Sequence, residues 1–212
     1  MTGSPQTFSE AVMTRIASLP VDQWDPELRK LAQADALPPV QQTMLGVYAN
    51  APELAKAFVI FSGALSQGLT LRRRLLELVR LRIAFHNQCR SCMAVRYQSA
   101  LDDGLTEDLV CSLEKPMEAP DLTDAEKAAI HYADLAASNH LAINDETLAN
   151  LRKYYSEKEI VELCMYVAYC VGFGRMAATY RIIEELPDSF QDTTTKITPW
   201  ADDHTERLVI RA

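Results

Sequence analysis

Two cysteines three residues apart, Cys89 and Cys92, are the residues of this chain with the clearest capacity for chemistry. Thiols at this spacing can close a disulfide within one helical turn, so that one attacks a substrate and the other resolves the product. Outside a secreted disulfide scaffold, such a pair indicates redox chemistry or metal binding before it indicates a structural cross-link. We therefore expect a thiol-dependent reaction at this pair.

Zinc is the main chemical alternative, and suitable ligands for it are few. A structural zinc site takes four ligands, usually two cysteine pairs or one pair with two histidines. Cys164 and Cys170 are six residues apart in an apolar segment, and His131 and His140 are nine apart, so neither pair completes such a site easily. We expect no metal, and because no glycine-rich phosphate loop follows a strand we expect no nucleotide or other cofactor. The three remaining cysteines, which include Cys111, are interpreted as small buried apolar residues.

The segment around the pair predicts a helix that carries Arg96 on the side of the thiols. At about 100° per residue, Arg96 lies one turn beyond Cys92 and within about 40° of it. Cys89 would lie in the first turn, where unpaired backbone N–H groups stabilise an anion by about 0.3–1 kcal/mol. Because a helix end and a cation both lower the pKa of a thiol, we expect Cys92 to be a thiolate at neutral pH.

Polar residues of the preceding segment are candidate partners for the thiols. Glu77 shares one side of its expected helix with two arginines, Arg80 among them, and this spacing alone indicates a solvated row of ion pairs. Arg82 and His86 fall within the apolar arc of the same helix, where polar groups need partners. They are interpreted either as a hydrogen-bonded structural pair or, for His86, as a proton shuttle beside Cys89.

The elements that must position these residues are predicted to be helices. Apolar residues recur at helical spacing, glycine and proline fall mostly between the periodic segments, and no segment alternates with period two for the length of a strand. We therefore expect an all-α fold. Helices are expected at about 8–19, 50–67, 71–85, 87–104, from 106 onward over a short stretch, 123–139, 145–154 and 156–185.

Capping residues indicate where several of these helices begin. Asn50 and Asn87 are interpreted as N-caps, and Asn87 would open the helix that carries the cysteines. Thr123 with Glu126, and Ser156 with Glu159, match the capping box, in which the cap hydroxyl and the N3 carboxylate satisfy each other's backbone donors. The cysteine pair is thus expected directly after a helix start.

The chain is expected to form a single all-helical domain over residues 1–212, with a core at about 38–187. Residues 188–212 are polar and irregular apart from the apolar patch Leu208–Ile210. We expect this C-terminal arm to pack on a neighbouring surface or to be disordered.

Composition limits the class of protein. Of the 212 residues 48% are apolar and 24% charged, which is ordinary for a soluble globular protein, and the net charge of −8 comes without a basic stripe, so no nucleic-acid partner is expected. The first ten residues lack the basic and apolar regions of a signal peptide, so we expect a cytoplasmic protein. The apolar run Leu163–Gly174 is too short to cross a hydrocarbon core of about 30 Å. We expect it at the centre of the fold or in a subunit interface, and no membrane partner.

The cysteine pair also stands in a pattern that resembles a known family signature. That signature is a Glu, then Asn-x-Cys-x-x-Cys, a His four residues on, an Ala and a Gly, and it is typical of the alkylhydroperoxidase AhpD-like, or carboxymuconolactone decarboxylase, family. The matching residues are Glu77, Asn87, Cys89, Cys92, Ala100 and Gly104. A looser likeness covers about 38–187. The resemblance implies an all-helical AhpD-like bundle that assembles as a trimer, hexamer or related homo-oligomer.

For the peroxidase branch, the resemblance assigns Cys92 as the peroxide-attacking thiol, Cys89 as the resolving thiol and Glu77 as part of a proton relay. The sequence departs from the pattern at Arg96, where the family has its activating His. Arginine cannot serve as a base, since its pKa exceeds about 12, but it can stabilise a thiolate or hold a carboxylate. Protons would then pass through Glu77, His86, Tyr97 or water.

Three functions stay open from the sequence. The preferred one is a thiol-dependent peroxidase or disulfide oxidoreductase, which reduces a hydroperoxide or a partner's disulfide and is recharged by a disulfide reductant protein. The second is a lyase of the carboxymuconolactone decarboxylase type, in which Arg96 and Arg175 hold the carboxylate of a small substrate and the thiols are dispensable. Tyr97 is a further expected substrate contact. The third is a non-catalytic oligomeric scaffold or binding protein.

Overall fold

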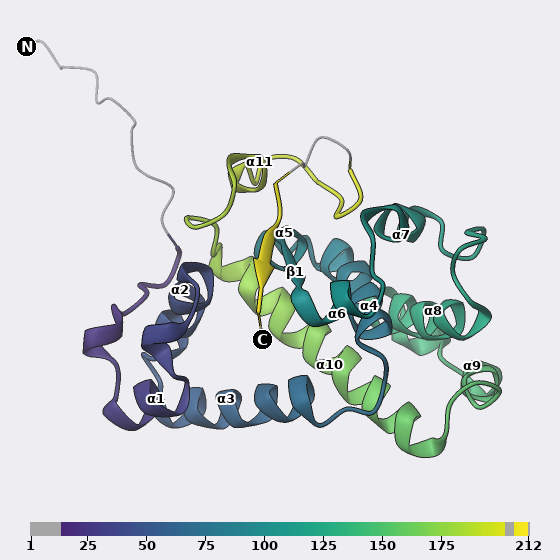
Figure 1. Cartoon of the computed structure of the whole chain (residues 1–212), viewed down its shortest axis with the longest axis horizontal. Helices are drawn as coiled ribbons and strands as arrows, with labels where there is room; N and C mark the ends of the chain where they lie inside the picture. Colours follow the sequence, from purple (N-terminus) through teal and green to yellow (C-terminus); the bar gives the residue numbers. More distant parts are fainter. Residues whose placement is uncertain (1–13, 202–205, 212) are drawn as a thin grey trace, which may run out of the picture.

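Helices make up most of the computed structural model, which describes residues 14–201 and 206–211 (Figure 1). The α-helices in this range are α1 Pro26–Leu31, α2 Pro39–Tyr48, α3 Pro52–Gln67, α4 Arg73–Asn87, α5 Arg90–Ala94, α6 Gln98–Asp102, α7 Glu107–Cys111, α8 Asp124–Ser138, α9 Asp145–Leu151, α10 Glu157–Tyr180 and α11 Asp188–Gln191. Four 3-10 turns lie at Val21–Gln23, Ala34–Ala36, Ser112–Glu114 and His140–Ala142. The expected helical class is confirmed.

One short β pairing is an exception to the expected all-helical architecture. Strand β1, Val95–Tyr97, runs parallel to β2, Leu208–Ile210, with Arg96 opposite Val209. Each strand has three residues, which is too short for period-two alternation to be recognised in the sequence. The pairing brings the C-terminal arm onto the segment directly after the cysteines.

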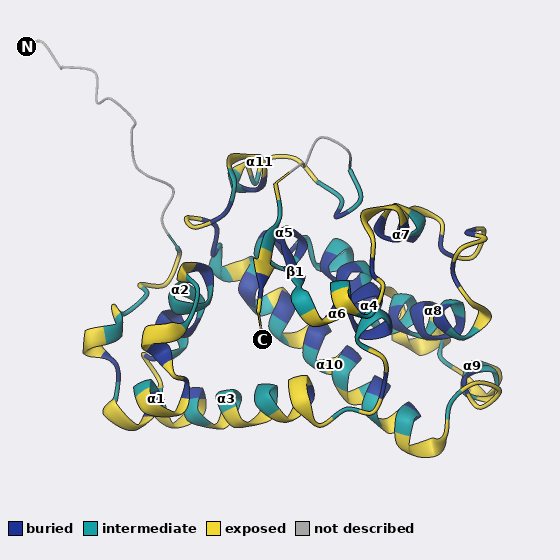
Figure 2. Ribbon diagram, viewed as in Figure 1, coloured by how far each residue is buried: buried dark blue, intermediate teal, exposed yellow. Residues whose placement is uncertain are grey.

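Helix α4 lies at the centre of the fold and packs against both α8 and α10, which also contact each other (Figures 1 and 2). These helices share a buried core that includes Leu78, Leu81, Ile130, Leu163 and Val167. Because α4 is covered on several sides, even the charged residues Glu77 and Arg80 in its middle turns are buried. Side chains on this helix are therefore held in fixed positions.

Helix α10 includes the apolar run Leu163–Gly174 and is much longer than that run. It is the one helix of the described residues with the length and hydropathy to cross a membrane. Because α10 packs along α4 and α8 as a core helix does, its length and hydropathy are only weak evidence for a membrane span. The other side of α10 leaves Val161 57% and Met165 48% exposed.

Several expected helix starts are confirmed by the capping contacts. Thr123 and Ser156 each form the complete capping box, with Glu126 and Glu159 as partners. The hydroxyl of Thr106 accepts the backbone N–H of Leu109 at the start of α7.

Two expectations for the N-terminal part are wrong. Residues 14–19 of the expected helix 8–19 are not helical, and residues 8–13 lie outside the described residues. Asn50 does not cap α3, because its amide donates to the carbonyls of Ala17 and Val47 at 2.9 and 3.0 Å. The helix begins at Pro52, whose fixed φ suits the first helical position and whose missing N–H needs no cap.

The expected helix 87–104 is interrupted, and this difference changes the site. Asn87 is the last residue of α4, Gln88 takes a left-handed conformation with φ of 51°, and Cys89 is the N-cap of α5. The helix then stops after Ala94, because the chain turns extended at Val95 to pair with β2. Cys92 and Arg96 therefore do not lie on one helix face.

The described parts of the C-terminal arm pack on α5. Phe190 of α11 is fully buried and Ile210 of β2 is 3% exposed. Both join a small core with Met93 and Ala94. Of the two alternatives for the arm, packing on a neighbouring surface is the one observed over these residues.

Candidate functional site

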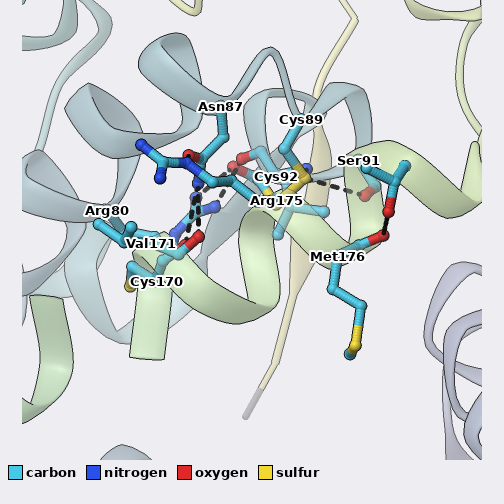
Figure 3. Close-up of a disulfide and its surroundings, with 11 residues drawn as sticks. Arg80, Asn87, Cys89, Ser91, Cys92, Cys170, Val171, Arg175 and Met176 are labelled. Carbon is cyan, nitrogen blue, oxygen red and sulfur yellow. Dashed lines mark hydrogen bonds between the residues drawn. A yellow bond between two sulfur atoms is a disulfide. The ribbon is translucent and has the colours of Figure 1, made fainter. Parts of the chain in front are cut away.

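Cys89 and Cys92 form a disulfide at the start of α5, with an S–S distance of 2.08 Å and Cα atoms 5.2 Å apart (Figure 3). Cys89 is fully buried, whereas Cys92 is partly exposed. Cys92 is therefore the sulfur of the pair that a molecule from solution reaches more easily. This difference in exposure agrees with the attacking role that the family resemblance implies for Cys92.

A buried ion pair lies directly beneath the cysteines. Glu77 is 2% exposed, and its carboxylate accepts Nε and Nη2 of Arg80, each at 2.7 Å. The same guanidinium donates to the carbonyl of Cys92 at 2.5 Å and to that of Val95 at 2.9 Å. The expected solvated ion-pair row at Glu77 is thus wrong, because the pair is enclosed and braces the backbone on both sides of the α5 end.

The role of Arg80 was missed from the sequence, although a signal was present. Glu77 and Arg80 stand three residues apart in the run Leu76-Glu-Leu-Val-Arg-Leu81, and all the remaining residues of this run are apolar. Charged residues so enclosed are rarely buried unless they pair. Burial opposes the charge of Arg80, but Glu77 outweighs it, so the pKa of Arg80 lies above its ordinary value and the side chain stays cationic.

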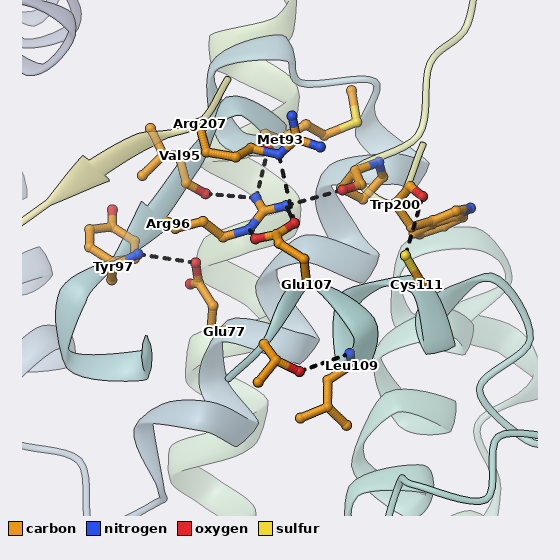
Figure 4. A network of polar contacts seen from close by, with 12 residues as sticks. Glu77, Met93, Val95, Arg96, Tyr97, Glu107, Leu109, Cys111, Trp200 and Arg207 are labelled. Carbon is orange, nitrogen blue, oxygen red and sulfur yellow. Dashed lines mark hydrogen bonds and ion pairs between the residues drawn. The ribbon is translucent and has the colours of Figure 1, made fainter. Parts of the chain in front are cut away.

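Tyr97 lies against this ion pair. Its backbone N–H donates to Glu77 Oε1 at 3.3 Å (Figure 4). The Arg80 guanidinium lies 5.2 Å from the centre of its ring. Burial raises the pKa of Tyr97, and the nearby cation of Arg80 only partly opposes this, so its phenol stays protonated. The structure thus brings Tyr97 and Glu77 together, through the backbone N–H of Tyr97 rather than through its phenol.

Cys170 of α10 is buried near the same cluster. Burial raises the pKa of its thiol to about 12, against the opposing charge of Arg80. It is therefore a neutral thiol and, as expected, a small buried residue. The same expectation is wrong for Cys111, which is exposed and donates to the carbonyl of Trp200, and Cys164 is only half-buried.

Arg96 does not face the thiols, which overturns the expected contact with Cys92. The side chain is 1% exposed, and its guanidinium donates to both carboxylate oxygens of Glu107 at 2.9 and 3.1 Å (Figure 4). Its other bonds go to the carbonyls of Met93, Val95 and Pro199. The extended backbone of β1 turns this residue away from the side of the pair, so its charge is matched by an acid and is not available to a thiolate.

His86 and Arg82 both bind Asp134 of α8. His86 Nε2 lies 2.8 Å from Asp134 Oδ1, and Arg82 Nε donates to the same oxygen at 2.6 Å. Burial alone would raise the pKa of Asp134, but these two partners outweigh it and hold the pKa below its ordinary value. The contacts are those of the structural alternative for His86 and Arg82, and no polar contact joins His86 to Cys89.

Arg175 lies on the exposed side of α10, near the end of α4 (Figure 3). Its Nε donates to Asn87 Oδ1 at 3.0 Å, and its Nη2 contacts the carbonyl of Ala137. The amide of Asn87 in turn donates to the carbonyl of Cys170 at 3.0 Å. Asn87, which was expected to cap the cysteine helix, instead ties α4 to α10.

Metal ligands do not gather in the described part of the chain. No group of three or more His, Cys, Asp or Glu residues there has the arrangement to hold an ion. The chemistry available at the site is that of the thiol pair, the buried Glu77–Arg80 ion pair and the phenol of Tyr97.

Comparisons with known proteins place this segment in context. Residues 52–135 match the model of the carboxymuconolactone decarboxylase family, and the match contains Glu77, both cysteines and Arg96. Uncharacterized proteins of two Mycobacterium tuberculosis strains, CDC 1551 and H37Rv, are each 39% identical over 89 residues. The match covers 41% of this chain, and the chain spans only 31% of the length of each relative.

Solved structures share the fold over a larger part of the chain. A protein of unknown function from Agrobacterium tumefaciens, whose description suggests an antioxidant defence protein AhpD, is 25% identical with a TM-score of 0.55 over 63% of this chain and 92% of its own. An alkylhydroperoxidase AhpD core, a peroxidase-related protein from Ralstonia eutropha JMP134, reaches a TM-score of 0.64 at 18% identity over 90% and 98%. The debrominase Bmp8, as a Cys-to-Ala variant with 2,3,4-tribromopyrrole, reaches 0.62 at 17% identity over 84% and 94%. Together these matches confirm the AhpD-like fold.

Proposed function

We propose that this chain, whose residues 52–135 belong to the carboxymuconolactone decarboxylase family, is a thiol-dependent oxidoreductase of the AhpD-like type. Its Cys89–Cys92 pair would cycle between dithiol and disulfide while it reduces a hydroperoxide or the disulfide of a partner. The observation that carries the proposal is the bonded pair itself, with Cys92 accessible and Cys89 buried behind it. Fold alone does not assign an activity, since Bmp8 has the same fold and is a debrominase.

The peroxide reaction balances over two steps at the pair. The thiolate of Cys92 attacks the terminal oxygen of the hydroperoxide, and the O–O bond breaks. Cys92 becomes a sulfenic acid, and the alkoxide that leaves takes a proton to become the alcohol. The thiol of Cys89 then attacks that sulfur, and water leaves as the disulfide forms. An external dithiol returns two electrons and two protons and restores the reduced pair.

The Glu77–Arg80 ion pair has two functions in this proposal. Arg80 fixes the carbonyl of Cys92 and places a permanent cation near the attacking sulfur, the role that the sequence suggested for Arg96. Glu77 is linked to this backbone through Arg80 and accepts the backbone N–H of Tyr97, a placement that supports it as part of the proton relay that the family resemblance implies. While the proton of Cys92 resides on Glu77, the cation of Arg80 is balanced by the Cys92 thiolate, so the buried site keeps its net charge.

The proposal is tested with fully reduced protein and one equivalent of cumene hydroperoxide. We expect loss of two alkylatable thiols in the mass spectrum, with the cross-link mapped to Cys89 and Cys92, and conversion of the peroxide to its alcohol. Cys92→Ser should abolish the reaction, and Cys89→Ser should accumulate a sulfenic acid that dimedone traps. Cys111→Ser, which changes an exposed cysteine outside the pair, is the matched control. Peroxide consumption by Cys92→Ser at the parent rate would end the proposal.

The lyase alternative is weakened, because one of its two expected carboxylate-binding residues, Arg96, is already paired with an acid. A substrate carboxylate cannot pair with Arg96 unless Glu107 is displaced, since this acid occupies the Nε–Nη2 edge of the guanidinium and backbone carbonyls take its other bonds. Arg175 remains as a candidate anchor on the surface. Full turnover of a carboxylated lactone after alkylation of the cysteines would favour the lyase. A scaffold without activity would instead show thiols of ordinary reactivity and no turnover.

We further propose that the chain works as a homo-oligomer. The two helices α3 and α10 pack through Phe58 and Phe173, whose rings lie 4.9 Å apart, and each also presents large apolar side chains to solvent. The most exposed of these are Leu54, Ile60 and Val161. Exposed apolar side chains in such number are typical of surfaces that another subunit covers.

A further inference from the structure

A basic cleft lies beside the disulfide and has no part in the reaction proposed above. It has a volume of about 510 Å³ and opens where the end of α4, the start of α5, the last turns of α10 and residues 193–196 meet. Five cationic side chains border it, and no Asp or Glu is among the described residues that do so. The cations are Arg15, Arg90, Arg175, Arg181 and Lys196. Since the chain has a net charge of −8, a purely cationic lining differs from the charge of the protein as a whole.

Arg90 is the residue that points to a ligand. It lies between the two cysteines and is only 6% exposed, yet its Nη1 has no hydrogen-bond partner, while Nη2 donates to the carbonyl of Thr195. A buried guanidinium nitrogen without an acceptor costs free energy, because it has lost water and gained nothing. Burial lowers the pKa of Arg90, and the carboxylate of Asp192 opposes this only in part. The site is therefore short of negative charge.

Two further arginines are held in place around the cleft. Arg181 ends α10 in a left-handed conformation with φ of 61°, and its Nη2 donates to Thr193 Oγ1 at 2.8 Å. Arg175 is oriented by its hydrogen bond to Asn87 Oδ1. Since these partners are neutral, neither cation is compensated by the contact that positions it.

We propose that this cleft binds a small molecule with a compact group of at least two negative charges, a phosphate or a polycarboxylate, with Arg90 as its central donor. A guanidinium fork matches the paired oxygens of either group, and several converging cations exceed what a single negative charge can balance. Ser91 borders the cleft, and its hydroxyl donates to Cys89 Sγ at 3.6 Å. The charged end of the ligand would therefore lie beside the disulfide, separated from it by the side chain of Ser91.

Calorimetric titration of the full, oxidised chain with sodium pyrophosphate and, separately, with sodium citrate tests this inference, with sodium chloride of equal ionic strength as the blank. We expect saturable binding of at least one anion, with tighter binding of pyrophosphate indicating a phosphate ligand and of citrate a carboxylate ligand. Arg90→Gln should weaken it about tenfold or more. Arg152→Gln, which removes the same charge from an exposed ion pair between the end of α9 and the start of α10, should leave it unchanged.

Arg181→Gln with Lys196→Gln serves as a second variant, because it leaves the buried Arg90 intact should Arg90→Gln fail to fold. We expect it to weaken binding as well. Heats that match the chloride blank for both anions would overturn the inference, as would binding of the parent affinity in this double variant. The result is separable from the proposed redox function, since Cys92→Ser should still bind the anion.

Discussion

Glu77 and Arg80 form a buried ion pair one turn apart on α4, and the guanidinium of that pair reaches the carbonyl oxygen of Cys92. The pair thereby couples the central helix of the fold to the backbone of Cys92. It also explains how a helix of only five residues is held at a defined position, since Arg80 binds carbonyls at Cys92 and Val95, near its C-terminal end.

Replacement of Glu77 by Gln should destabilise the protein strongly. It leaves Arg80 charged and buried without its counter-ion, a change that typically costs about 3–5 kcal/mol. Urea denaturation measures the loss. The double variant Glu77→Gln with Arg80→Met should be less unstable than the sum of the two single variants. As the control, Arg152→Gln breaks an ion pair that is 51% and 71% exposed and should cost no more than about 1 kcal/mol.

The interaction of Asp134 with His86 and Arg82 should give stability a specific dependence on pH. Because the folded protein holds the pKa of Asp134 below its ordinary value, the contribution is complete above the unfolded pKa of about 3.9 and is lost as the pH falls through the folded value. The difference in unfolding free energy between the parent and Asp134→Asn should thus still be present at about pH 5 and shrink below about pH 4. A difference that grows on acidification would contradict this. Glu185→Gln, at an exposed position, is the control.

Two glycines of α10 should respond oppositely to alanine. A Cβ at Gly174 would lie 2.6 Å from the amide nitrogen of Asn87 and must displace this link between α4 and α10. Gly174→Ala should therefore destabilise by about 1–3 kcal/mol. A Cβ at Gly172 meets nothing within 4 Å, so Gly172→Ala should stabilise by about 0.5–1 kcal/mol through helix propensity. Thermal melting of both variants measures the contrast, and equal shifts would refute the assigned contact.

A charge on the exposed side of α3 should break the proposed assembly. Ile60 is 63% exposed, so Ile60→Glu should leave the folded subunit intact while it lowers the mass measured by light scattering after gel filtration. Lys30→Glu, on the surface of α1, controls for the introduction of a negative charge. A monomeric parent protein would contradict the homo-oligomer proposal at once.

How far the sequence predicts this protein depends on the range of the interactions involved. The capping boxes at Thr123 and Ser156 and the disulfide spacing of Cys89 and Cys92 were predicted correctly, because each depends on groups three residues apart. The family resemblance added the fold. The interruption after Ala94 could not be predicted, since its cause is a strand at Leu208–Ile210, far along the chain.

Local sequence therefore specifies most of the helices, several of their starts and the presence of a thiol pair, because backbone capping and helical periodicity act over a few neighbouring residues. Contacts between distant segments determine which arginine contacts the segment that carries the pair. A helix wheel selects Arg96, but burial of α4 and the pairing of β1 with β2 direct Arg96 to Glu107 and leave Arg80 at Cys92. The same long-range packing encloses Arg90 and forms the basic cleft, whose cations come from four separate segments of the chain.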